Sequence, residues 1–162
     1  MMSTSEIQRI LDELEREHEG DPWHGSPLRA ILDGIDAAQA VKKPIPAAHS
    51  IWELVLHMTS WKQEVAQRVK GNTAGEPASG DWPAVGEPTE VRWRQALDGL
   101  ERAHRDLLAA IESLPEAKLF EPTKAERDRP LGAGVSYYVL LHGIVQHDVY
   151  HAGQIALLKK AS

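Results

Sequence analysis

Hydrophobic residues recur at helical spacing in four long segments of the chain, and little of the sequence alternates as a half-buried strand does. A shorter helical pattern begins at Ser26-Pro27, with Ser26 as the N-cap and Pro27 in the first turn. Each long segment has one apolar stripe, so the four helices are expected to pack together and bury these stripes. The long segments are residues 3–18, 50–70, 89–114 and 136–160.

Two helix starts carry a local signature of their own. Ser3 and Glu6 have the spacing of a capping box, in which each side chain bonds the backbone N–H of the other residue. Ser50 and Glu53 have the same spacing at the second long segment, which Gly71 ends. The sequence therefore predicts helices that begin at Ser3 and at Ser50.

The segments that join the predicted helices are long. Residues 71–88 are rich in Gly, Pro, Ala and Glu, and residues 115–135 contain several prolines and glycines. Antiparallel neighbours in a bundle need only roughly 2 to 8 linking residues, so these links leave room for a crossover. We predict an all-α fold: one domain over residues 1–162, a four-helix bundle with long crossover connections plus a short extra helix.

Composition narrows the class of protein. With 162 residues, 42% hydrophobic and 26% charged, the chain resembles an ordinary soluble domain. The net charge of −6 and the absence of a basic run argue against nucleic-acid binding. The absence of cysteine excludes disulfides, thiolate metal ligands and a cysteine nucleophile. No apolar run suits a membrane span and no signal-peptide pattern is present, so we expect a cytoplasmic protein without a membrane partner.

The strongest candidate chemistry is a histidine pair in the last predicted helix. His147 and His151 are four residues apart, which places them on one face and roughly 6 Å apart along the axis. The pair could bind a metal ion with a third ligand from another helix, for which His57 is the candidate. Three imidazole ligands would leave a coordination position for water or substrate. Two histidines four residues apart on a helix can also be a polar pair that binds no metal. The zinc-protease pattern H-E-x-x-H is absent, because Asp148 follows His147.

Three neighbouring side chains could support these histidines from behind. Glu53 could accept a hydrogen bond from His57 one turn away, but its capping role already explains it. Asp148 is a further candidate. Gln154 could orient His151 or a metal-bound water, or could bond across helices.

A resemblance to a known family covers almost the whole chain. Residues 147–155, His-Asp-Val-Tyr-His-Ala-Gly-Gln-Ile, look like the C-terminal H-x-x-x-H-x-G-Q motif of the DinB/YfiT-like superfamily. Residues 49–57 resemble its second-helix motif, and residues 22–28 resemble an N-terminal signature of one branch. The resemblance implies a four-helix bundle, often dimeric, with a divalent metal held by three histidines. It makes His57, His147 and His151 the metal ligands.

The resemblance also implies an activity. The superfamily includes enzymes that transfer low-molecular-weight thiols such as bacillithiol or mycothiol, and proteins described as metal-dependent hydrolases. We expect a thiol S-transferase, with a hydrolase or a non-enzymatic stress-associated metal-binding protein as the alternatives. Zinc is the expected ion and nickel the alternative. The expected partners are a small-molecule substrate and a second copy of the chain; the substrate itself and the catalytic residues stay open.

Five other residues have roles that the sequence leaves open. His49 could border a pocket or stand at the helix start, and His24 could line the pocket or anchor its loop. Trp82 could cap the pocket or anchor the loop at 71–88. His142 is expected at a core or interface contact, and Gly153 is expected to permit close helix packing.

Overall fold

The computed structural model describes residues 5–124 and 134–162, and these residues contain helices but no β-strand. Within these two ranges, four long helices and two short ones are joined by loops and one 3₁₀ turn, η1. An isolated bridge pairs Pro122 with Ser136. The all-α prediction is therefore confirmed. The elements are α1 (Glu6–His18), α2 (Leu28–Leu32), α3 (Ala37–Ala40), α4 (Ile51–Val69), α5 (Glu90–Glu112), η1 (Glu116–Lys118) and α6 (Tyr137–Ala161).

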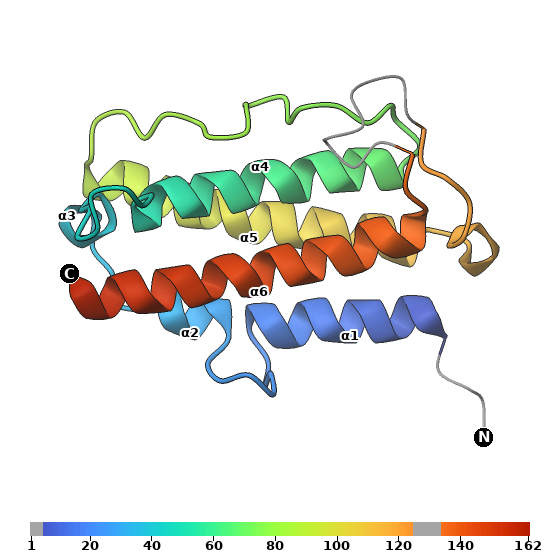
Figure 1. Ribbon diagram of the computed structural model, residues 1–162, viewed down its shortest axis with the longest axis horizontal. Helices are drawn as coiled ribbons and strands as arrows, with labels where there is room; N and C mark the ends of the chain where they lie inside the picture. Colours follow the sequence, from blue (N-terminus) through green and yellow to red (C-terminus); the bar gives the residue numbers. More distant parts are fainter. Residues whose placement is uncertain (1–4, 125–133) are drawn as a thin grey trace.

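The long helices form a bundle with a crossover connection. Figure 1 shows α4 and α5 running in one direction, and α1 and α6 running in the other. The loop at 70–89 returns along the length of α4 before α5 begins, as two parallel neighbours require. Helix α4 packs against α5 and α6, and α1 packs against the same two helices. The predicted bundle with a long crossover is confirmed.

The start and end of α4 follow the predicted signals. The Ser50 hydroxyl accepts a hydrogen bond from the backbone N–H of Glu53, 3.2 Å away, and Glu53 Oε2 accepts one from the N–H of Ser50 at 2.8 Å. Gly71 follows the helix with φ of 89°, a left-handed conformation that glycine adopts without steric cost.

The predicted start of α1 at Ser3 is wrong. Helix α1 begins at Glu6, and its capping box joins Ser5 to Gln8, two residues later than expected. The N–H of Glu6 donates to Glu116 Oε1 at 2.8 Å, a tertiary contact that favours this start. Ser3 itself lies outside the described residues.

The short helices differ in detail from expectation. Pro27, not Ser26, is the N-cap of α2, and it makes no side-chain capping bond. Helix α3 was not predicted; the Asp36 side chain caps it by accepting from the N–H of Gln39 at 2.7 Å. These helices pack on α6, α4 and α5 and close one end of the bundle.

The apolar core is divided into two clusters along the bundle. One cluster joins α2 and α3 to the N-terminal halves of α4 and α5 and the C-terminal half of α6. The other joins α1 to the opposite halves of the same long helices. Between them lies a set of buried polar residues that we call the polar layer. Its members are Glu17, His18, Lys62, His104 and Asp148.

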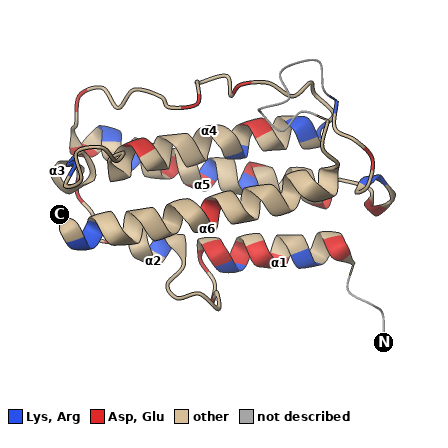
Figure 2. Ribbon diagram, in the orientation of Figure 1, with Lys and Arg blue, Asp and Glu red and all other residues tan. Residues whose placement is uncertain are grey.

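Helix α6 has few charges along its length. Figure 2 shows one acidic position near its middle and basic positions at its C-terminal end; these are Asp148, Lys159 and Lys160. Asp148 is fully buried. None of the described helices combines the length and apolar character that crossing a bilayer requires.

Candidate metal centre

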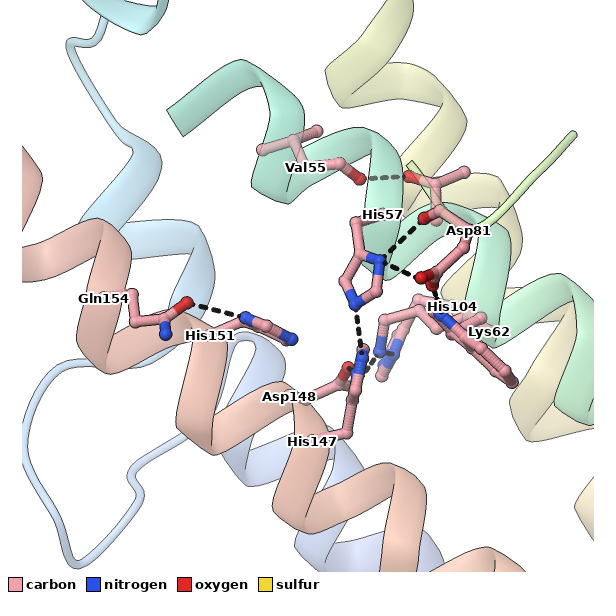
Figure 3. A network of polar contacts seen from close by, with 11 residues as sticks. Val55, His57, Lys62, Asp81, His104, His147, Asp148, His151 and Gln154 are labelled. Carbon is pink, nitrogen blue, oxygen red and sulfur yellow. Dashed lines mark hydrogen bonds and ion pairs between the residues drawn. The ribbon is translucent and has the colours of Figure 1, made fainter. Parts of the chain in front are cut away.

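Helices α4 and α6 bring three imidazole rings together, each from the central part of its helix. His57 comes from α4, and His147 and His151 come from α6 (Figure 3). One ring nitrogen of each lies within 4.8 Å of the others, and the Nε2 atoms of His57 and His147 are 3.0 Å apart. His57 and His151 are buried, whereas 24% of the His147 side chain is exposed. The structure thus brings together the three residues singled out in the sequence.

Two of the rings are oriented by oxygen atoms behind them. His57 Nδ1 lies 2.7 Å from the backbone oxygen of Asp81, and His151 Nδ1 lies 2.8 Å from Gln154 Oε1. A carbonyl oxygen only accepts, so each Nδ1 carries the proton and donates it. The Nε2 atoms of both rings then carry lone pairs, as metal-ligating histidines require.

The third ring lies near a carboxylate but is not hydrogen-bonded to it. His147 Nδ1 lies 3.5 Å from Asp148 Oδ1, and neither atom has a hydrogen-bond partner among the described residues. A proton on this Nδ1 would leave the His147 Nε2 lone pair opposite that of His57. Two of the imidazoles therefore have the hydrogen-bonded oxygen that usually supports metal-bound histidines, and the third has a carboxylate oxygen nearby.

Electrostatics favour a cation at the centre of the three rings. Burial lowers the pKa of His57, and burial with the nearby His147 and His57 rings lowers the pKa of His151 to about 4. Both rings are consequently neutral near neutral pH, the form that binds a metal. The Nε2 atoms of His57 and His147 are 3.0 Å apart, close enough for both to bind one ion, and one nitrogen of His151 lies within 4.8 Å of a nitrogen in each of those rings. The donor set fits a divalent ion.

The loop between α4 and α5 covers one side of the centre. The Trp82 ring stacks on His57, with ring centroids 3.8 Å apart and planes 8° from parallel. Trp82 also stacks on His49 at 3.5 Å. Asp81 Oδ1 accepts a hydrogen bond from Trp61 Nε1 at 2.7 Å, which fastens the loop to α4. Of the two roles left open for Trp82, the structure favours covering the centre, and His49 borders that cover.

Asp81 is the contact that sequence reasoning missed. Its backbone oxygen accepts from His57, and its carboxylate oxygen Oδ1 lies 3.2 Å from the same Nδ1. The residue stands in an irregular loop, 24 positions after His57. No periodicity or motif links the two positions, so the sequence held no signal for this contact.

Of the two residues, Gln154 contacts a clustered histidine and Glu53 does not. Glu53 caps α4 and pairs with Lys43 Nζ at 2.9 Å, so it does not support His57. The capping explanation is confirmed. Gln154 contacts His151, which favours the orienting role.

Three other candidates lie away from the centre. His24 and Gly153 line a groove of about 770 Å³ that includes none of the three clustered histidines. A Cβ added to Gly153 would meet no atom within 4 Å, so the expected close helix packing there is wrong. His142 lies 3.5 Å from Glu6 and 3.6 Å from Glu13, an interhelical contact with α1 as expected.

The polar layer begins at the residue next to His147. Asp148 forms a buried ion pair with Lys62, whose ammonium also lies 3.3 Å from His104 Nδ1 (Figure 3). Burial would raise the pKa of Asp148, but Lys62 and His147 together hold it below its ordinary value. Burial and the Lys62 charge lower the pKa of His104 to about 2, which keeps that ring neutral.

The rest of the polar layer comes from the end of α1. His18 stacks on His104 at 3.8 Å, and its Nε2 lies 3.0 Å from Glu101 Oε1. Both carboxyl oxygens of Glu17 are buried, without a hydrogen-bond partner in the part of the chain described. Burial, and then the charge of Asp148, raise the pKa of Glu17 to about 8. Glu17 is therefore mostly protonated at neutral pH.

Comparison with known proteins identifies similar sequences and folds. The family model of the DinB superfamily matches residues 23–155. The crystal structure of a conserved protein from Enterococcus faecalis is similar over 98% of each chain, with a TM-score of 0.71 and 16% sequence identity. At that identity the likeness shows a common fold. No match was found among curated proteins.

Proposed function

Because the chain belongs to the DinB superfamily, we propose that its three clustered histidines bind one divalent metal ion and that the protein is a metal-dependent enzyme. The observation that carries the proposal is the 3.0 Å approach of the His57 and His147 Nε2 atoms, in rings with oxygen atoms near their Nδ1 atoms. Lone pairs at this distance repel unless a cation or a proton lies between them. Zinc is the proposed ion, with nickel as the alternative.

The proposed reaction joins a low-molecular-weight thiol to an electrophile. A divalent ion held by the three histidines would supply Lewis acidity, which would favour the deprotonated form of the thiol. Overall, the thiol proton passes to solvent, the sulfur bonds to carbon, and the leaving group departs with its electron pair. Asp81 and Gln154 fix the orientation of the His57 and His151 rings. Trp82 excludes water from one side of His57.

The carboxylates near the centre already have interaction partners, which favours thiol transfer over hydrolysis. Hydrolysis requires a proton acceptor beside the attacking water. The Asp81 carboxylate accepts from Trp61, and that of Asp148 pairs with Lys62. A thiol that is already ionised needs no such base, so we rank hydrolysis second.

A non-enzymatic role is the remaining alternative. Structural zinc sites usually take all four ligands from protein, whereas the described residues supply three to this cluster. The partial exposure of His147 leaves that side open to a ligand from solution. A ligand from a second copy would favour the structural role; the homodimer and the cytoplasmic location stay predictions.

The test pairs metal analysis with a thiol-transfer assay. Tag-free protein loaded with zinc is mixed with β-mercaptoethanol, bacillithiol or mycothiol and the electrophile monobromobimane. We expect conjugation above the uncatalysed rate, loss of the acceleration in His57→Ala and after chelation, and recovery when zinc is returned to the wild type. His24→Ala is the matched control, because that histidine lies on a separate groove. If the zinc-loaded protein accelerates conjugation with none of these thiols, the transferase proposal is contradicted.

A further inference from the structure

An apolar pocket adjoins the candidate metal centre between α4 and α6. It measures about 250 Å³, and His147 forms part of its wall. Trp61, whose indole N–H bonds Asp81, forms another part. The pocket thus shares His147 with the metal centre, and Trp61 of its wall is hydrogen-bonded to the covering loop. The remaining wall is largely aliphatic, from Val65, Val135, Val139, Leu140 and Ile144.

The one charged residue on the described wall is engaged by partners. Arg68 Nε donates to Glu64 Oε1 at 2.8 Å, and its Nη2 donates to the backbone oxygen of Gly75 at 2.8 Å. The carboxylate offsets the guanidinium charge, so the pocket gives little electrostatic preference for an anion. Its chemistry suits an uncharged apolar group.

Gly143 leaves part of this pocket open. A Cβ added there would meet no atom within 4 Å, so packing against neighbours does not require glycine. A glycine inside a helix costs about 1 kcal/mol relative to alanine. Any larger residue at this position would add side-chain atoms at the pocket wall. The missing side chain therefore keeps space beside the metal centre.

We propose that this pocket binds the apolar group of the substrate, an aromatic ring or a short branched alkyl chain, while the reacting atoms lie at the histidines. The inference rests on the proposed function and names its substrate class. A cavity of about 150 Å³ can hold benzene, so the larger pocket can hold a ring with a few further carbons. The groove that includes His24 is larger, but it has no residue in common with the metal centre.

The apolar group is that of the electrophile, and the test compares two thiols that differ in their apolar part, because a benzyl group on sulfur lies where the electrophile's group is joined after transfer. Benzyl mercaptan and β-mercaptoethanol are titrated into cobalt-loaded protein, and binding is followed by the cobalt–thiolate absorption. Burial of a phenyl-sized group predicts about 10- to 100-fold tighter binding of benzyl mercaptan, after correction for the two thiol pKa values. In zinc-loaded protein, which is diamagnetic, methyl NMR signals of Val65, Val139 and Ile144 should shift with benzyl mercaptan and not with β-mercaptoethanol.

Two variants that add a small and a large side chain at Gly143 test whether the preference for benzyl mercaptan arises in this pocket. Gly143→Ala should weaken the preference for benzyl mercaptan, and Gly143→Leu should abolish it while binding of cobalt and β-mercaptoethanol persists. Gly153→Leu is the matched control on the same helix, because a Cβ added there also meets no atom within 4 Å and the position lies at the other groove. It should bind both thiols as the wild type does.

The outcomes separate this inference from the proposed function. Equal affinity for the two thiols, or an unchanged preference in Gly143→Leu, would overturn the pocket assignment and leave metal binding intact. A Gly143→Leu variant that alters only the oligomeric state would assign this face to a second copy instead. If the protein takes up no metal, the proposed function fails; benzyl alcohol then tests the pocket, and the absence of methyl shifts would refute it.

Discussion

Two clusters of buried polar residues meet on α6 and differ in the source of their positive charge. In the polar layer, the Lys62 ammonium lies between Asp148 and His104, so the protein supplies its own cation. In the candidate metal centre, neutral imidazoles face one another, and no lysine or arginine contact is recorded there for the described residues. The first cluster is electrostatically complete, whereas the second requires a proton or an ion.

The geometry of one helix explains how adjacent residues serve both clusters. Successive residues of an α-helix are rotated by roughly 100°. His147 therefore faces His57 at the edge of the bundle, while Asp148 faces the centre and is fully buried. We infer that the polar layer stabilises the frame and that the three histidines carry the chemistry.

The largest expected effect comes from removing the internal cation. Lys62→Met would leave Asp148 buried and unpaired, which costs about 3–5 kcal/mol of unfolding free energy. Urea denaturation at neutral pH measures this loss. The double variant Lys62→Met with Asp148→Leu should regain most of it, since an apolar replacement of both partners avoids the unpaired charge. A loss below about 1 kcal/mol in the single variant would contradict the internal-cation account.

The oxygen atoms that orient the histidine rings should affect how tightly the centre binds zinc. Gln154→Ala removes the acceptor behind His151, and loss of such a contact typically weakens metal binding by about 10- to 100-fold. Zinc competition titrations measure the change, with Gln146→Ala on the same helix as the control. Equal affinities in the two variants would show that Gln154 does not orient a ligand.

Glu17 should make the fold sensitive to alkaline pH. Its pKa is raised from 4.5 to about 8 by burial and by Asp148, so the folded state retains a proton that the unfolded state loses earlier. Its stabilising contribution is present in full below the unfolded pKa and is lost as pH rises through about 8. The histidines with lowered pKa values still titrate near pH 6.5 in the unfolded state, so the effect of Glu17 is the difference in unfolding free energy between the wild type and Glu17→Gln. We expect this difference, wild type minus variant, to fall by about 1–2 kcal/mol between about pH 6.5 and about pH 9.

Glu17→Gln is the variant that checks this assignment, because glutamine keeps the shape and has no titrating proton. Guanidinium denaturation of both proteins across the same pH range measures the difference in their unfolding free energies. A difference, wild type minus variant, that stays constant or rises with pH would refute the assignment.

The smallest expected effect concerns the cover of the metal centre. Trp82→Ala removes a ring stacked on His57, an interaction worth about 0.5–1.5 kcal/mol. Zinc affinity should fall by roughly 2- to 10-fold if this stacking holds the ring in place. Trp23→Ala is the matched control, because that side chain is fully exposed. If Trp82→Ala binds zinc as tightly as the wild type, the Trp82 ring packs against His57 without orienting it for the metal.

The sequence contains a signal for the central ion pair of the polar layer. Lys62 lies four residues after Met58 and three before Val65, at a position of the apolar stripe. Asp148 lies four residues after Ile144 and four before Ala152, again on a buried face. A charged residue on the stripe of each helix predicts that the two meet inside the bundle, since each needs a partner there.

Other features could not be predicted because tertiary contacts decide them. Ser3 with Glu6 and Ser5 with Gln8 both fit a capping box, and local sequence does not choose between them. The contact of Glu6 with Glu116 favours the later start. The histidine spacing, in contrast, is set by helix geometry and was predictable. Asp81 and Trp82 reach the centre through an irregular loop, whose path periodicity does not encode.

The most direct test of the central claim is calorimetric titration of zinc into metal-free, tag-free protein. The account predicts one zinc per chain for the wild type, and loss of this binding in His57→Ala and in His151→Ala. His104→Gln alters the polar layer and should still bind one zinc if it folds, which circular dichroism establishes. A wild type that binds no zinc, or His57→Ala and His151→Ala variants that bind it as tightly as the wild type, would contradict the assignment of these histidines as the metal centre.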